Sequence, residues 1–241
     1  MKKTVFAALA AATALAAPAF ADGHSERYVM ITHTQGTDPF WPVVENGGRD
    51  AAAAIGATLE YNFDVSGDMA AMAALIEAAA ASNPDGIIVS LPDAAALGPA
   101  IMAAVADGIP VVTMNSGLES SAELGALMHV GQPERDAGEA AGTRAASEGV
   151  TTGLCLNQEA FNTALVDRCE GYFSGLGGDL NMLDVSNAPA QIDTRTAAAL
   201  QAAPSIDGVL AVGPHVCEAA VKAIDAVGAD VEMVRQGIGS D

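Results

Sequence analysis

The sequence has 241 residues, of which thirty are Asp or Glu and ten are Lys or Arg, so its formal net charge is −20 at pH 7. This charge repels phosphate backbones and anionic lipid headgroups, and no local cluster of Lys and Arg offsets it, which excludes nucleic acids and membrane surfaces as partners. With 51% hydrophobic residues, the chain can still bury a substantial core.

The first 21 residues have the three parts of a secretory signal peptide. Lys2 and Lys3 carry positive charge, the stretch 4–17 is small and apolar, and Ala19-Phe20-Ala21 forms a cleavage site before Asp22. The apolar run is shorter than the ~20 residues of a membrane-spanning helix. A buried N-terminal helix is the alternative. We expect cleavage near Ala21 and export to the periplasm, which leaves eight basic residues against thirty acids and a net charge of −22.

Beyond the leader, runs rich in Val, Ile and Leu alternate with Ala-rich stretches of helical length. This alternation is typical of parallel strands joined by crossover helices. The first series predicts strands at 28–33, 58–63, 86–90 and 110–114, with helices at 42–55, 68–81 and 94–106. Pro42 suits a first helical turn, and the sequences 83–86 and 107–108 contain the Gly and Pro that end helices.

The periodicity lapses over 115–123 and then resumes, which predicts two lobes. The second series predicts strands at 126–130, 152–156, 181–185, 208–212 and 231–238, with helices at 134–148, 162–176, 194–202 and 215–227. The expected fold class is α/β, with Rossmann-like lobes on parallel sheets at 22–115 and 116–241. Because right-handed crossovers bring the loops after strands to one sheet edge, the binding site is expected in those loops.

The loop after the first strand places two aromatic residues side by side, in a chain with only 4% aromatics. Phe40 and Trp41 can pack against the C–H faces of a sugar ring, while Asp38 accepts hydrogen bonds from its hydroxyls. An equally simple interpretation is that the two rings anchor the following helix to the core. Spacing does not decide between these roles.

Three further loops that follow strands carry short polar side chains. They are Ser90 to Asp93, Asn115-Ser116, and Asn157-Gln158-Glu159 followed by Asn162. Such groups can orient a polar ligand at the sheet edge. We therefore take Asp93, Asn115 and Asn162 as candidate ligand-binding residues.

Arg168 lies within an otherwise apolar helical face, where an unpaired charge is costly. A ligand oxygen could accept its hydrogen bonds. A structural salt bridge to Asp167, Glu170 or Asp241 is the alternative.

The cysteines and histidines show no spacing typical of a metal site or a catalytic relay. In an oxidising compartment two of Cys155, Cys169 and Cys217 can pair, and the shortest loop joins Cys155 to Cys169. All three could equally be small buried hydrophobic residues. Among the histidines, His215 is the best binding candidate, because Gly213-Pro214-His215 ends a strand at the expected ligand edge.

Four segments, in this order and spacing, resemble the periplasmic sugar-binding proteins of ABC importers, the group typified by ribose-binding protein. The resemblance spans residues 28–241. Its most specific pieces are Asp38-Pro39-Phe40-Trp41, Asn83-Pro84-Asp85-Gly86-Ile87-Ile88, Gly108-Ile109-Pro110-Val111-Val112 with Asn115, and Arg168-Cys169-Glu170-Gly171-Tyr172.

The resemblance implies a non-enzymatic protein without cofactor or metal, which captures a sugar or polyol between its lobes and delivers it to a membrane permease. It implies that Phe40 and Trp41 sandwich or flank the sugar, that Asp38 and Asn115 bind its hydroxyls, and that Arg168 clamps its oxygens. Asp241 aligns with a further acid. Gln191 and Pro214 depart from the family pattern, which favours a different sugar or a polyol. Because family members continue for several more elements, we expect the chain to be truncated at its C-terminus.

The sequence leaves two other functions to consider, a sensor and an enzyme. A periplasmic sensor that reports a sugar or autoinducer to a chemoreceptor or kinase would use the same fold and cleft. An enzyme on a nucleotide-type α/β sheet would need a phosphate-cradling loop or a catalytic motif, and the sequence contains neither G-x-G-x-x-G, a P-loop nor G-x-S-x-G.

Overall fold

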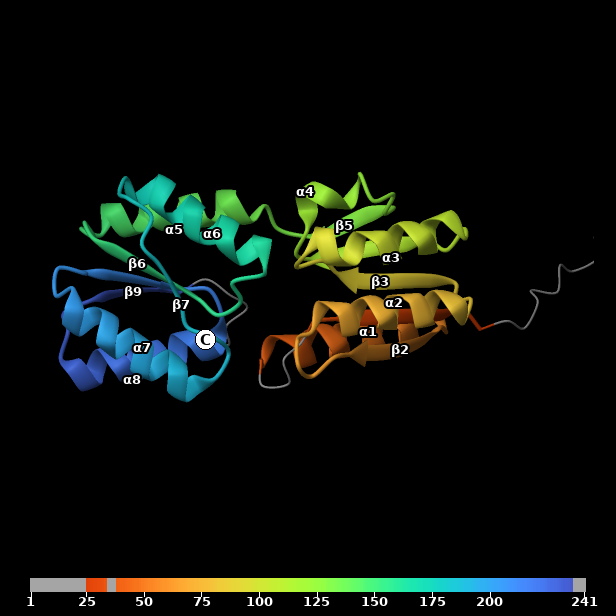
Figure 1. Cartoon of the computed structure of the whole chain (residues 1–241), viewed down its shortest axis with the longest axis horizontal. Coiled ribbons are helices and arrows are strands. Elements are labelled where there is room, and N and C mark those ends of the chain that lie inside the picture. The colour runs from red at the N-terminus through yellow and green to blue at the C-terminus, as the bar shows by residue number, and fades with distance from the viewer. Residues whose placement is uncertain (1–24, 34–37, 236–241) are drawn as a thin grey trace, which may run out of the picture.

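The computed structural model describes residues 25–33 and 38–235, which form two α/β lobes side by side (Figure 1). Strands and helices alternate as the sequence predicts. In chain order they are β1 (Arg27–Thr32), α1 (Phe40–Ile55), β2 (Thr58–Phe63), α2 (Met69–Ala81), β3 (Gly86–Ser90), α3 (Ala94–Ala106), β4 (Val111–Asn115), α4 (Leu118–Ser121), β5 (Met128–Gly131), α5 (Glu134–Ser147), β6 (Gly153–Asn157), α6 (Thr163–Leu176), β7 (Met182–Asp184), α7 (Pro189–Ala202), β8 (Gly208–Ala211), α8 (Pro214–Val227) and β9 (Glu232–Arg235).

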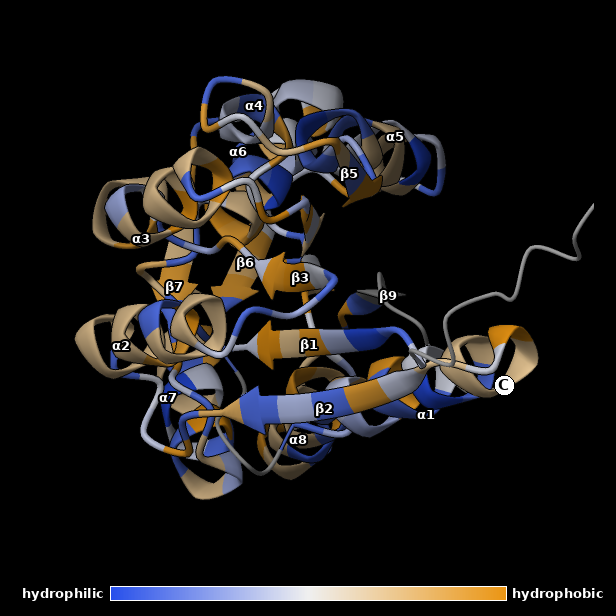
Figure 2. Ribbon diagram, turned by 90° about the vertical axis from the view of Figure 1, so that its right-hand side faces the viewer, coloured by the Kyte–Doolittle hydropathy of each residue, from blue (hydrophilic) through white to orange (hydrophobic). Residues whose placement is uncertain are grey.

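Both sheets are parallel within the described residues. The first has the order β2-β1-β3-β4-β5 and the second the order β7-β6-β8-β9. Central strands of parallel sheets are buried on both faces and are therefore continuously apolar. In Figure 2, β3 and β6 are coloured mainly as hydrophobic, whereas the edge strand β2 alternates between hydrophilic and hydrophobic residues.

Helices cover both faces of each sheet. In the first lobe, α2 and α3 pack on one face around Ile31, Ile76 and Ile101, while Trp41 of α1 packs on the other face with Met30 and Met114. In the second lobe, α7 and α8 bury one face of β6 and β8, and α5 and α6 bury the other. The helices thus leave the carboxyl ends of the strands open toward the facing lobe.

The predicted lobe boundary at residues 115 and 116 is wrong. β5 pairs with β4, with Val112 opposite Met128 and Asn115 opposite Gly131, so the strand predicted to begin the second lobe completes the first sheet. The chain crosses to the second lobe between β5 and α5. The return of strand periodicity locates a strand but does not say which sheet it joins.

The structure joins Cys155 of β6 to Cys169 of α6 in a disulfide, which is the pairing that loop length favoured. Cys217 is buried in the second lobe between α8 and the sheet. The disulfide fastens α6 to the central strand of the second sheet. Arg168, the residue before Cys169, is held against that sheet with it.

Helices α5 and α6 lie in backbone contact through two pairs of glycines. A Cβ added at Gly138 or Gly142 would collide with the carbonyl oxygen of Arg168 or Tyr172, and one added at Gly171 or Gly175 would collide with the backbone of α5. Glycine at these positions is required because nothing larger fits between the two helices.

We predict that Gly138→Ala lowers the free energy of unfolding by about 2 kcal/mol or more, because the new methyl group has only backbone to displace. The control is Gly47→Ala on the exposed face of α1, where an added Cβ meets nothing within 4 Å. This control should stabilise the protein by about 0.5–1 kcal/mol. Urea unfolding measures both, and equal stability of the two variants would contradict the close helix packing.

Candidate functional site

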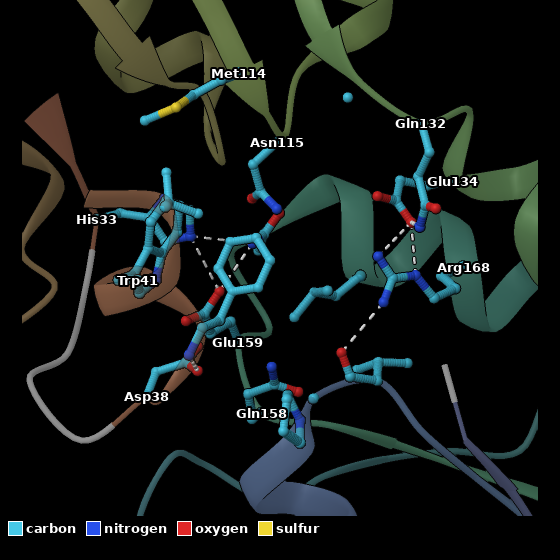
Figure 3. A pocket seen from close by; sticks show the side chains of 18 of the residues that line it. His33, Asp38, Trp41, Met114, Asn115, Gln132, Glu134, Gln158, Glu159 and Arg168 are labelled. Atoms are coloured by element: carbon cyan, nitrogen blue, oxygen red, sulfur yellow. Dashed lines mark hydrogen bonds and ion pairs between the residues drawn. The ribbon is translucent and has the colours of Figure 1, made fainter. Parts of the chain in front are cut away.

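A cavity lies between the lobes, where the carboxyl ends of strands from both sheets face each other (Figure 3). Its volume is about 560 Å³, within the range of small-molecule sites. The first lobe contributes residues after β1, at the start of α1, and at the ends of β4 and β5. The second contributes the loops after β6 and β8 and the inner face of α6. The lining residues are His33, Asp38, Phe40, Trp41, Val44, Met114, Asn115, Val130, Gly131, Gln132, Glu134, Gln158, Glu159, Asn162, Leu165, Arg168, Val212, Gly213 and Pro214.

The aromatic wall of the cavity comes from the start of α1. Trp41 is buried, and its ring stands edge-on to His33 (centroids 4.9 Å apart) and to Phe40 (5.0 Å apart). Phe40 is only partly buried and lines the cavity in front of it. Trp41 therefore holds Phe40 in place, and Phe40 offers the more accessible ring surface to a ligand.

A buried polar network connects the two lobes at one side of the cavity. His33 of the first lobe places Nε2 3.3 Å from Glu159 Oε2 of the second. Asn162 donates to the same Glu159 oxygen at 2.8 Å, and Asn187 donates to Oε1 at 3.2 Å. Although burial raises the pKa of Glu159, these contacts, His33 foremost, outweigh it and leave the pKa below its ordinary value. Glu159 is therefore an ionised carboxylate inside the protein.

The orientation of His33 follows from its other ring nitrogen. Ser90 Oγ accepts a hydrogen bond from the backbone N–H of His33 at 3.1 Å and lies 2.7 Å from Nδ1. In the tautomer in which Nδ1 accepts the hydroxyl proton of Ser90, Nε2–H donates to Glu159. A backbone hydrogen bond from Thr163 N–H to the Pro92 carbonyl, 3.1 Å long, adds a second link between the lobes.

Asp38 lies near this network at the N-terminal end of α1. Its carboxylate accepts from Phe40 N–H at 2.9 Å, and His215 Nδ1 lies 3.7 Å away. Burial raises the pKa of Asp38, while the Phe40 N–H and the nearby His215 oppose the shift. Burial is the larger effect, so the pKa of Asp38 lies above its ordinary value.

An ion pair occupies the opposite side of the cavity. Arg168 of α6 donates to Glu134 Oε2 through Nε at 2.6 Å and through Nη2 at 2.5 Å, and its Nη1 donates to the Val212 carbonyl at 3.2 Å. Gln132 Nε2 donates to the same Glu134 oxygen at 3.0 Å. Both charged side chains are more than nine-tenths buried. The glycine contacts between α5 and α6 set the distance between them.

Two amide side chains complete the polar lining. Asn115 ends β4 in the left-handed region, at φ 62°, a conformation that Asn tolerates better than most residues. Gln158 lies in the loop after β6, and its Oε1 is buried without a hydrogen-bond partner among the described residues. The cavity therefore combines an aromatic wall with carboxylate, amide and guanidinium groups from both lobes.

Comparison with known proteins identifies this arrangement. A family model described as a periplasmic binding protein domain matches residues 28–241. The chain belongs to the periplasmic binding protein family. A comparison with curated proteins gave no match. Membership explains the layout of the site, since this family binds solutes rather than transforming them.

Solved structures of the family agree with this assignment. A carbohydrate transporter from Acidothermus cellulolyticus 11B, in complex with myo-inositol, shares 39% identity and a TM-score of 0.85, with 88% of this chain and 74% of that chain covered. A periplasmic sugar-binding protein from Legionella pneumophila shares 20% identity, with 86% and 80% covered and a TM-score of 0.80. A solute-binding protein from Burkholderia graminis in complex with D-arabinose also shares 20% identity, with 89% and 76% covered and a TM-score of 0.80. The latter two show the fold.

Six of the candidate residues line the cavity of this binding protein. They are Asp38, Phe40, Trp41, Asn115, Asn162 and Arg168. His215 lies behind the lining, where its Nε2 is 2.9 Å from Asn187 Oδ1. Asp241 lies outside the described residues.

Asp93 has a different place from the one expected. It is the N-cap of α3, and its carboxylate accepts from the N–H groups of Ala95 and Ala96. Short acidic residues before a helix serve as caps and as ligand groups alike, so residue type did not distinguish the two roles.

The salt bridge considered for Arg168 exists, but with another partner. Asp167 and Glu170 lie on the outer side of α6 and pair with Arg135 instead. Glu134 was not among the candidate residues, and neither were His33 and Glu159. The helix start after β5 could have indicated Glu134, since it follows a strand like the other site loops. Among the described residues there is no cluster of His, Cys, Asp and Glu suited to a metal and no helix able to cross a membrane.

We predict that Asp38→Asn stabilises the protein at pH 7 and that this gain shrinks as the pH falls toward 4. A raised pKa in the folded state means that folding favours the protonated acid, so the wild type loses stability as the pH rises through that pKa. Asn keeps an acceptor for Phe40 N–H without the charge. Urea unfolding of both proteins from pH 4 to 8 tests this, and a difference independent of pH would contradict it.

Proposed function

We propose that this chain is a periplasmic solute-binding protein that captures a sugar or cyclic polyol between its lobes and delivers it to an ABC transporter permease. The observation that carries the proposal is the cavity itself, which is lined by the Phe40 ring and by polar side chains from both lobes. An aromatic face suits the C–H surface of a ring, and amide and carboxylate groups suit its hydroxyls. Asp38, Asn115, Asn162 and Arg168 would bind those hydroxyls.

Closure of the two lobes is the proposed mechanism. A ligand that contacts both lobes binds the closed form more tightly than the open form and so shifts the population toward closure. The His33–Glu159 and Thr163–Pro92 contacts are made only when the lobes meet, so they favour the same state. The permease would then recognise the closed form.

The likeness to the Acidothermus protein points to the ligand class. That protein shares 39% identity and was solved with myo-inositol, a ring with a hydroxyl on every carbon. A cyclic polyol fits a cavity whose polar groups surround the aromatic wall on several sides. Inositols and hexopyranoses are therefore the first ligands to test.

A thermal-shift screen of inositols, hexoses, pentoses and linear polyols tests the proposal, because a ligand that binds only the folded protein raises its melting temperature. We expect a cyclic polyol to raise it by several degrees at millimolar concentration. No shift with any of these compounds would contradict the proposed function.

Phe40→Ala should weaken binding of the best ligand at least 10-fold in isothermal titration, because the ring loses its stacking surface. The matched control is Phe63→Ala, which removes an exposed aromatic ring on β2 outside the cavity and should leave affinity unchanged. If the Phe40 variant and the wild type bind with equal affinity, the Phe40 ring does not contact the ligand.

A further inference from the structure

We infer that Glu134 is a specificity-determining residue, which makes this a site for uncharged ligands by neutralising Arg168 and so excluding sugar acids and phosphates. The inference rests on the proposed function and names the charge of its ligand. Among the described lining residues Arg168 is the sole Lys or Arg, whereas Asp38, Glu134 and Glu159 are acids.

The guanidinium of Arg168 is already compensated. Two of its N–H groups donate to Glu134 Oε2 and a third donates to the Val212 carbonyl. A buried ion pair of this kind has little net charge to offer an incoming anion, because the carboxylate and the guanidinium both line the cavity. An arginine has five N–H donors, so two remain for ligand oxygens. Glu134 therefore leaves Arg168 able to bind a hydroxyl but not to balance a negative charge.

The remaining acids strengthen this exclusion. The contacts with His33, Asn162 and Asn187 stabilise the Glu159 carboxylate within the protein. They leave no excess positive charge that could bind an anionic ligand. Asp38 is partly buried and accepts a hydrogen bond from Phe40 N–H. A carboxylate or phosphate on the ligand would be repelled by these acids, whereas a hydroxyl can donate to them.

Matched ligand pairs test the inference on the unaltered protein. The pairs are D-glucose with D-glucuronate, D-galactose with D-galacturonate, and myo-inositol with myo-inositol 1-phosphate, each measured by isothermal titration at pH 7.5. For any pair whose neutral member binds, we expect the anion to bind at least about 100-fold more weakly. An anion that binds within 10-fold of its neutral partner would overturn the inference and leave the proposed function standing.

Glu134→Gln tests the role of this residue directly. The amide can still accept from Arg168 but no longer cancels its charge, so the ratio of anion to neutral affinity should rise at least 10-fold. The control is Glu139→Gln on the exposed side of the same helix, which should leave the ratio unchanged. Because each ratio is measured within one protein, a partial loss of folded variant does not alter it.

The outcomes separate the two proposals. An unchanged ratio in Glu134→Gln, with the neutral ligand still bound, would overturn the role of Glu134 alone. If neither the neutral member of any pair nor any other uncharged sugar or polyol binds, the proposed function is contradicted. Tight binding of an anion alone would overturn both.

Discussion

The two lobes of this protein meet through buried polar groups, and this constraint shapes the rest of the site. His33 and Glu159 approach within 3.3 Å across the boundary, and Asn162 and Asn187 satisfy the remaining carboxylate positions. A buried carboxylate is tolerated only when it is paired and hydrogen-bonded. Contacts of this kind require precise alignment of the lobes, whereas apolar surfaces would tolerate sliding. In the proposed open form these polar groups would be hydrated, which offsets part of the loss of their contacts.

The rigid parts of each lobe lie behind these polar contacts. Trp41 packs beneath Phe40, and the glycine pairs bring α5 and α6 into backbone contact behind Glu134 and Arg168. The side chains that face the cavity are thus supported by tight packing on the opposite side. The proposed binding and closure can then depend on a few groups, because their neighbours are closely packed.

Most of the fold could be predicted from the sequence because parallel strands are continuous apolar runs and their helices are rich in alanine. The strands at 58–63 and 86–90 and the helix at 94–106 have the predicted bounds. Helix α7 begins at Pro189 rather than at 194, because its first turn contains polar residues that carry no helical periodicity. β5 was placed in the wrong lobe because a strand's partner depends on the path of the chain.

The site could be predicted only in part. Four site residues could be predicted because they lie at or just after the ends of strands, and the topology brings those loops together. They are Asp38, Phe40, Asn115 and Asn162. The pairing of Arg168 with Glu134, 34 positions away, depends on how α5 and α6 pack, and residue spacing holds no signal for that.

The Cys155–Cys169 disulfide has a consequence for how the protein must be made. It fastens the helix that bears Arg168 to the central strand, and it forms only in an oxidising compartment. A chain retained in the reducing cytosol would hold that helix by packing alone. Export to an oxidising periplasm, as the leader sequence predicts, would then complete the covalent structure of the site.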